Sequence, residues 1–107
     1  MAEQIAGNRD IVVGTNDSLT VAGDSTVRIG RNSHIKVESN QAWSAGKNIV
    51  VKAGDSLELV CGAASILLKK DGTVVIKGKD ITLDASGKIN VKGNSDVVIK
   101  GSKLSQN

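Results

Sequence analysis

The sequence predicts an all-β fold, an intertwined homotrimeric parallel β-helix with the cross-section of a triangular prism, built from octad repeats. Three observations predict it: a pair of aliphatic residues recurs about every eight residues, glycines fall between the pairs, and aromatic residues are almost absent. The 107 residues include 12 Gly and one Trp, but no Phe, Tyr or Pro. A globular core of this size usually draws on several aromatic side chains, whereas Ile and Val suit strands packed in thin layers.

The repeat is one aliphatic residue, any residue, and a second aliphatic residue. Successive pairs are separated by steps of 8, 8, 8, 14, 8, 9, 8, 7, 8 and 8 residues. Residues i and i+2 of a strand face the same side, so each octad is expected to form a short strand with two inward side chains, followed by a turn. The expected trimer core consists of Ile11, Val13, Leu19, Val21, Val27, Ile29, Ile35, Val37, Trp43, Ile49, Val51, Leu57, Leu59, Ile66, Leu68, Val74, Ile76, Ile81, Leu83, Ile89, Val91, Val97 and Ile99.

The step of 14 marks an irregular stretch at residues 38–48. Counting eight residues on from the preceding pair reaches Trp43 and Ala45, which indicates a twelfth strand layer, or rung, with a shortened turn at Gly46–Asn48. The alternative is that residues 38–48 form an outward loop with Trp43 on the surface.

The same spacing predicts one β-helical domain over residues 1–107. A lead-in at 1–10 precedes about twelve octad rungs at 11–99, and a tail follows at 100–107. A solenoid made of one chain needs polar caps to hide its open strand edges, and neither end carries a recognisable cap. A cyclic trimer closes the lateral edges instead. A monomeric β-solenoid that serves as a binding or adhesive module is the alternative.

The octad pattern also makes predictions for the residues between and after the paired aliphatics. The residue between two paired aliphatics is expected to face outward, and five apolar residues at such positions are read either as exposed β-formers or as residues packed under neighbouring turns: Val12, Val50, Leu67, Val75 and Val98. The residue after a pair is expected to form charged columns that keep rods apart. In the later octads these are Lys52, Lys69, Lys77, Lys92 and Lys100.

Charge and composition exclude several classes of protein. The net charge is +3, and residues 63–107 carry eight Lys against four Asp, but no basic cluster is interleaved with aromatics, so no nucleic-acid partner is expected. The single cysteine, Cys61, permits no internal disulfide and no metal-type Cys/His spacing. The first 20 residues lack the apolar core of a signal peptide, and no 18-residue apolar run exists.

Candidate chemistry is sparse, and neither an enzyme, a cofactor nor a metal site is expected. His34 precedes an inward position and so points outward, as a surface histidine rather than a metal ligand. Cys61 is expected to be a small, half-buried filler near a corner. Two acidic pairs can be imagined as glycosidase carboxylates, but turns of about five residues wall off no groove, so they are read as turn or surface residues: Asp80 with Asp84, and Asp55 with Glu58.

Three stretches carry a resemblance to a known family. They are ASILLKKDGTVVIKGKDITL at residues 64–83, GKINVKG at 87–93 and IKGSK at 99–103. Together with the octads they resemble the C-terminal β-helix, or needle, of valine-glycine repeat protein G (VgrG), the spike of bacterial type VI secretion. The resemblance covers roughly residues 8–104, and similar octads occur in the central spikes of contractile-tailed phages.

The resemblance implies a passive structural spike rather than an enzyme. Such a needle punctures the target cell envelope, with transient membrane contact, and carries a PAAR-repeat tip protein at its C-terminal end. It implies contact with the secretion tube protein through an N-terminal region that this sequence lacks. It also implies assembly in the cytoplasm and export by the machine to the extracellular space or a target cell. The docking surface for the tip protein would be Val97, Ile99, Lys100, Gly101, Ser102 and Lys103.

Overall fold

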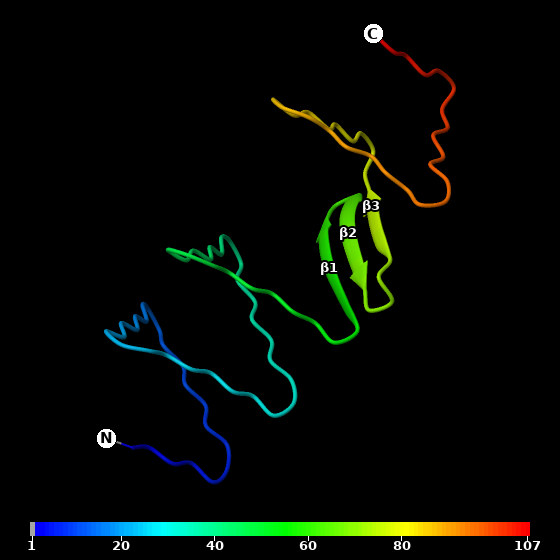
Figure 1. Ribbon diagram of the computed structural model, residues 1–107. Helices are drawn as coiled ribbons and strands as arrows, with labels where there is room; N and C mark the ends of the chain where they lie inside the picture. Colours follow the sequence, from blue (N-terminus) through cyan, green and yellow to red (C-terminus); the bar gives the residue numbers. More distant parts are fainter. Residues whose placement is uncertain (1) are drawn as a thin grey trace. The chain divides into compact units, whose positions relative to one another are not determined.

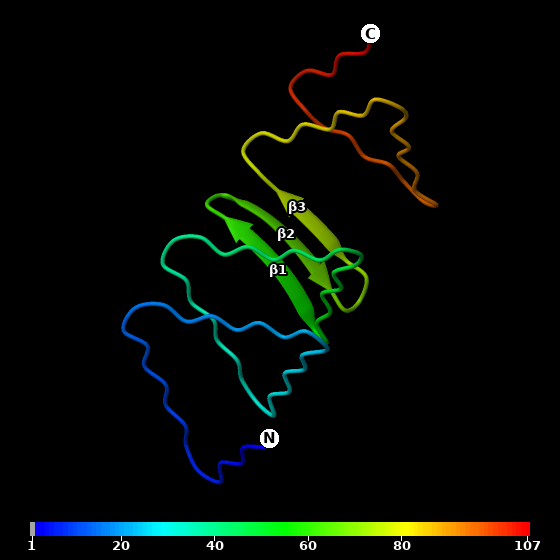
Figure 2. The ribbon, with the colours of Figure 1, turned by 90° about the vertical axis from the view of Figure 1, so that its left-hand side faces the viewer.

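The computed structural model describes residues 2–107, and the regular structure in that range is entirely β. Its strands are β1 (Ser56–Cys61), β2 (Ala64–Lys69) and β3 (Val74–Lys77), which form one antiparallel sheet in the order β1-β2-β3 (Figure 1). The view in Figure 2 shows the three strands side by side again. The all-β prediction is confirmed. The described range contains no helix that could cross a membrane.

A two-residue turn joins β1 to β2. Cys61 pairs with Ala64, which leaves Gly62 and Ala63 as the loop. Gly62 has a φ of 56°, and among residues 2–107 no residue other than glycine has a positive φ. This φ pattern matches the type II′ hairpin turn, whose first central position requires glycine and whose twist suits the flanking strands.

Four residues separate β2 from β3, and backbone hydrogen bonding of Lys69 with Thr73 closes a three-residue loop at 70–72. The N–H of Gly72 donates to the carbonyl of Lys69 at 3.0 Å, and the N–H of Lys69 donates to the carbonyl of Thr73 at 2.9 Å. Gly72 has a φ of 95°. A type I turn followed by a left-handed glycine is a common three-residue hairpin connection. The Asp71 side chain adds to it, because its Oδ1 accepts a hydrogen bond from the N–H of Thr73 at 3.0 Å.

Outside the sheet the described chain is extended and does not pair with itself. Its backbone hydrogen bonds to itself lie in the strand ladders and in three further bonds between residues 55 and 73. The chain divides into two units, Met1–Trp43 and Ser44–Asn107. The first has no strand in the part that the structure describes, and the second contains the sheet. The parallel β-helix predicted between copies of the chain stays a prediction, whereas the pairing within residues 56–77 is antiparallel.

The chain alone has no hydrophobic core. No side chain in residues 2–107 is buried, and the accessible surface is 11979 Å². A compact monomer of 11.1 kDa is expected to expose about 5,700 Å², and the same chain unfolded about 16,000 Å². The single chain therefore exposes roughly 6,000 Å² more than a compact monomer of this mass.

Candidate functional site

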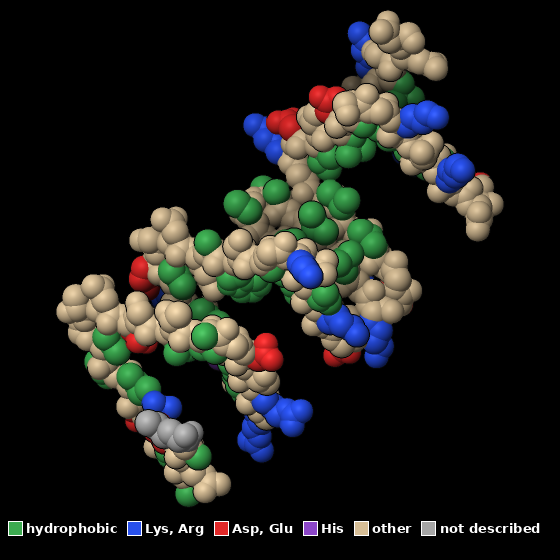
Figure 3. Space-filling model, turned by 60° about the vertical axis from the view of Figure 1, so that its left-hand side comes forward, with side chains coloured by type: hydrophobic (Ala, Val, Ile, Leu, Met, Phe, Trp, Pro, Cys, Tyr) green, Lys and Arg blue, Asp and Glu red, His purple; other side chains and the backbone are tan. Residues whose placement is uncertain are grey.

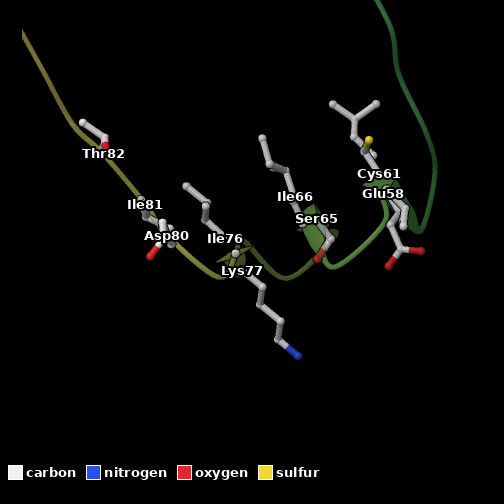
Figure 4. Close-up of a pocket in the computed structure, with 13 residues that line it drawn as sticks. Glu58, Cys61, Ser65, Ile66, Ile76, Lys77, Asp80, Ile81 and Thr82 are labelled. Carbon is white, nitrogen blue, oxygen red and sulfur yellow. The ribbon is translucent and has the colours of Figure 1, made fainter.

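The sheet gathers predicted core residues on one face, which we call the aliphatic face. The register places Leu57, Leu68 and Val74 in one row across the three strands, and a second row holds Leu59, Ile66 and Ile76. Residues two apart share a face, so both rows lie on the same side of the sheet. Figure 4 shows Ile66 and Ile76 projecting to one side. The expected sharing of one face is thus observed for three consecutive pairs, whereas their burial in a trimer core stays a prediction.

The opposite face carries the charges of the sheet. Glu58 lies directly across from Leu67, and Lys77 lies across from Ser65. Glu58 and Lys77 point away from the side on which Ile66 and Ile76 project (Figure 4). Leu67 and Val75, which interrupt the alternation, pair across β2 and β3 on this second face and are half-buried. The long stems of charged neighbours can cover such apolar side chains while the charged groups stay in water.

Side chains outside the sheet follow the same alternation. Val12 is 93% exposed, whereas its neighbours Ile11 and Val13 are 64% and 48% exposed. Val50 is likewise more exposed than Ile49 and Val51, whereas Val98 is more exposed than Val97 but similar to Ile99. Lys36 and Glu38, two residues apart, place Nζ and Oε1 within 3.6 Å, which fits a shared outward side. The residues between pairs therefore face away from the pairs.

The aliphatic residues outside the sheet remain accessible in the single chain. Figure 3 shows hydrophobic side chains reaching the surface in many places along the chain. Ile89 and Val91 are 53% and 67% exposed, and Trp43 is exposed as well. An inward rung and an outward loop at residues 38–48 both leave Trp43 accessible in one chain, so the two interpretations of that stretch stay open.

A hollow of about 600 Å³ extends along one end of the aliphatic face. Leu59, Cys61, Ile66 and Ile76 line it from the sheet, and Asp80 and Ile81 line it from the segment that follows β3 (Figure 4). Its lining is mostly apolar, which suits packing against another apolar surface. Residues 2–107 hold no group of three His, Cys, Asp or Glu side chains that could bind a metal ion.

The residues singled out for possible chemistry are exposed and lie in different settings. His34 and Cys61 are both exposed. Asp80 lines the hollow, and Asp84 does not. The carboxylate of Asp55 lies 3.7 Å from Nζ of Lys70, and its carbonyl accepts from the N–H of Lys70 at 3.0 Å, so Asp55 ties the start of β1 to the turn after β2. Such an exposed ion pair adds little to stability.

Asp71 titrates differently in the folded loop between β2 and β3 than in the free side chain. The hydrogen bond from the backbone N–H of Thr73 lowers the pKa of the Asp71 carboxyl, with a smaller contribution from the Thr73 side chain. A carboxylate that accepts a hydrogen bond is stabilised in its charged form. The acceptor is part of the loop between β2 and β3, so its role here is local structure.

The tail combines apolar and basic side chains. Residues 97–103, the predicted docking surface for a tip protein, are all exposed, with Lys100 and Lys103 close to Ile99 in the sequence. Leu104, which follows Lys103 directly, is a further exposed apolar residue of the tail, 68% exposed. It lies outside the pair pattern.

Comparison with known proteins gives one strong partial match. No family profile matches the chain. A stretch of 34 residues is 65% identical to the type VI secretion system spike protein VgrG1b of Pseudomonas aeruginosa, and the match covers 32% of this chain and 5% of that protein. The chain is thus related to a VgrG spike protein over about a third of its length, as the resemblance predicts. It corresponds to only a small part of the relative.

Proposed function

We propose that this chain forms the needle of a type VI secretion spike, as a homotrimer with a structural rather than an enzymatic role. The observation that carries the proposal is the 65% identity over 34 residues to a type VI spike protein. The octads extend one repeating pattern over residues 11–99, most of the chain.

The exposure of the aliphatic pairs supports an assembly of several chains. A monomeric solenoid would bury its inward pairs within one chain, yet no side chain in residues 2–107 is buried. The extended segments also leave backbone N–H and C=O groups without partners in the same chain, whereas a folded protein makes about one internal hydrogen bond per residue. Pairing with other copies satisfies both requirements at once, and closed cyclic symmetry removes the lateral edges.

The mechanism of such a needle is mechanical. Strands from three chains, hydrogen-bonded in closed layers around an apolar axis, resist bending and buckling when a contracting sheath drives the spike forward. Charged side chains such as Glu58 and Lys77, which face away from the aliphatic pairs, keep neighbouring needles from associating. The needle punctures the target envelope and contacts the membrane only in passing, so no binding pocket is required.

The partners of the needle follow from the same proposal. A PAAR-repeat protein docks on the C-terminal tail around Val97–Lys103 and sharpens the tip. The tube protein is engaged through a region N-terminal to the needle in the complete spike. The trimer assembles in the cytoplasm and leaves the cell through the secretion machine, to the extracellular space or into a target cell.

A secretion assay tests the function. A bacterium with an active type VI system produces the complete spike protein that contains this needle, either unchanged or with Ile89→Asp, and release of tube protein and killing of target cells are measured. Ile89→Asp, which places a charge on the proposed axis, is expected to abolish both, whereas Asn90→Asp at the adjacent outward position retains them. Normal release and killing with Ile89→Asp would contradict the proposal.

A further inference from the structure

Within the regular runs of octads, eight-residue spacing leaves the alignment of three copies ambiguous. If one chain shifts by a whole octad, an aliphatic pair again meets an aliphatic pair, as the equal steps between Ile11 and Val37 and between Ile81 and Ile99 show. Register is weakly specified where the apolar pattern repeats without interruption. A homotrimeric needle therefore needs a segment that distinguishes one alignment from the next.

Residues 56–77 differ from the regular octads. Leu57 and Ile66 are nine residues apart instead of eight, because the two-residue loop at Gly62 and Ala63 turns the chain back antiparallel. The loop at Lys70–Gly72 turns it a second time. Each of the two loops has a glycine with positive φ, and in the described chain only Gly62 and Gly72 have one.

We propose that the aliphatic face of this three-stranded sheet is a docking surface for the same face of two further copies, and that its docking fixes the alignment of the three chains. The inference rests on the proposed trimeric needle. The sheet makes its own hydrogen bonds within one chain, so it can form before its partners arrive. Small isolated sheets are only marginally stable in water, so packing of the apolar face against the other copies completes them.

The chemistry of the face fits a second copy of itself. The two rows from Leu57 to Ile76 carry no charged residue, whereas Glu58, Lys69 and Lys77 lie on the other face. Copies of a chain with net charge +3 repel each other weakly, and an uncharged face is where they approach most easily. The hollow of about 600 Å³ beside Ile66 and Ile76 offers room for side chains of a neighbouring copy. The surface left uncovered by the chain exceeds what many obligate interfaces bury.

Two matched double variants of the full chain test the inference. Ile66→Ser with Leu68→Ser removes a pair from the sheet, and Ile89→Ser with Val91→Ser removes a pair from a regular octad. Mass is measured by sedimentation, and hydrogen exchange of the trimer is followed by mass spectrometry on peptides covering residues 11–18 and 97–104. In an aligned trimer all three copies of a terminal peptide have the same neighbours, so the peptide exchanges as one population. If one chain is shifted by an octad, its end extends beyond the others, and the peptide exchanges as two populations.

The expected result is one population for the unchanged chain and for the 89/91 variant, and two populations for the 66/68 variant. If the 66/68 variant loses the trimer while the 89/91 variant keeps it, the docking role is supported, and Ile66→Ala then supplies the exchange measurement. An unchanged chain that is monomeric contradicts the proposed function itself. Two other results overturn this inference alone. In the first, the unchanged chain forms a normal trimer, and the 66/68 variant or Ile66→Ala still gives one exchange population. In the second, both double variants lose the trimer equally.

Discussion

At the scale of the residue, the parity of a position along the strand, odd or even, determines which face of the sheet an apolar side chain occupies. Leu59 and Ile66 lie opposite each other on the aliphatic face, whereas Leu67 lies across from Glu58 on the other. Composition alone does not distinguish these leucines and isoleucines, because hydropathy is similar at both kinds of position. Position relative to the aliphatic pair does distinguish them, since consecutive side chains of a strand point to opposite faces.

Substitution at Ile89 and Asn90 tests this parity outside the sheet. Ile89→Asp places three carboxylates near the proposed axis, and burying an unpaired charge or its protonated acid is expected to destabilise the trimer by about 3 kcal/mol or more per chain. Asn90→Asp introduces the same charge one residue away on the outward side and is expected to change stability by less than about 0.5 kcal/mol. Thermal unfolding at one protein concentration measures both.

Equal destabilisation by the two substitutions would contradict the assignment of Ile89 to the axis. Ile89 is half-exposed in the single chain, so a monomer offers no reason for the two positions to differ strongly. A difference in stability between the two variants would therefore show that partner chains cover Ile89.

At the scale of the element, the hairpin loops depend on two glycines. Gly72→Ala is expected to destabilise the sheet by about 1–2 kcal/mol, because a Cβ is disfavoured at a φ of 95°. Gly46→Ala is the control, since Gly46 has no positive φ and no atom within 4 Å of an added Cβ. That change is expected to be neutral or mildly stabilising, because it restricts the unfolded chain. Chemical denaturation compares them, and a Gly72→Ala protein as stable as Gly46→Ala would contradict the loop geometry.

The pH dependence of the second loop follows from Asp71. Its carboxyl has a lowered pKa in the folded loop, so its stabilising contribution is present above the unfolded pKa of about 3.9 and is lost as the pH falls through the lower folded value. The amide of Thr73 is expected to exchange faster with hydrogen below that pH than the pH dependence of intrinsic exchange predicts. Asp71→Asn keeps the acceptor oxygen but does not titrate, so its Thr73 amide should follow intrinsic exchange alone. The same departure in both proteins would show that another group is responsible.

The sequence predicted which residues share a face more reliably than how the strands pair. The pairs Leu57/Leu59, Ile66/Leu68 and Val74/Ile76 were recognised, and the sheet places all six on one side. The octads do not predict the antiparallel pairing within residues 56–77, because a period of two indicates the face of a strand and not the direction of its neighbour. The signals were present, however: a step of nine between Leu57 and Ile66, and an Asp71-Gly72 dipeptide between two aliphatic strands, which favours a hairpin.

At the scale of the whole molecule, residues 2–107 bury no side chain within one copy. In the proposed trimer, contacts between copies cover the aliphatic pairs and give the extended backbone its hydrogen-bond partners. Neither the sequence nor one chain fixes the number of copies, because the exposure of Ile89 or Val97 shows that a surface needs covering and not how many chains cover it. Closed layers of a triangular prism require three.

The stability of the proposed trimer therefore depends on protein concentration. For an obligate trimer the melting temperature is expected to rise with protein concentration, because dissociation accompanies unfolding. Sedimentation at micromolar concentration is expected to give three times the chain mass of 11.1 kDa. A compact species of single-chain mass, with a melting temperature independent of concentration, would support the monomeric solenoid instead.

The tip is the last point at which the whole assembly meets a partner. Three symmetry-related tails bring three copies each of Lys100 and Lys103 to one end of the proposed needle, next to Ile99 and Leu104. Reversing the charge at both lysines, Lys100→Glu with Lys103→Glu, is expected to weaken binding of a PAAR-repeat protein at least about tenfold, because charge complementarity guides such docking. Lys47→Glu with Lys52→Glu makes the same change in charge several octads from the tail and should leave the affinity within about threefold, since stacked strands lie about 4.8 Å apart and screening limits its reach to about 10 Å. Calorimetric titration of each trimer measures the affinities, and equal weakening by both variants would move the docking surface away from residues 97–104.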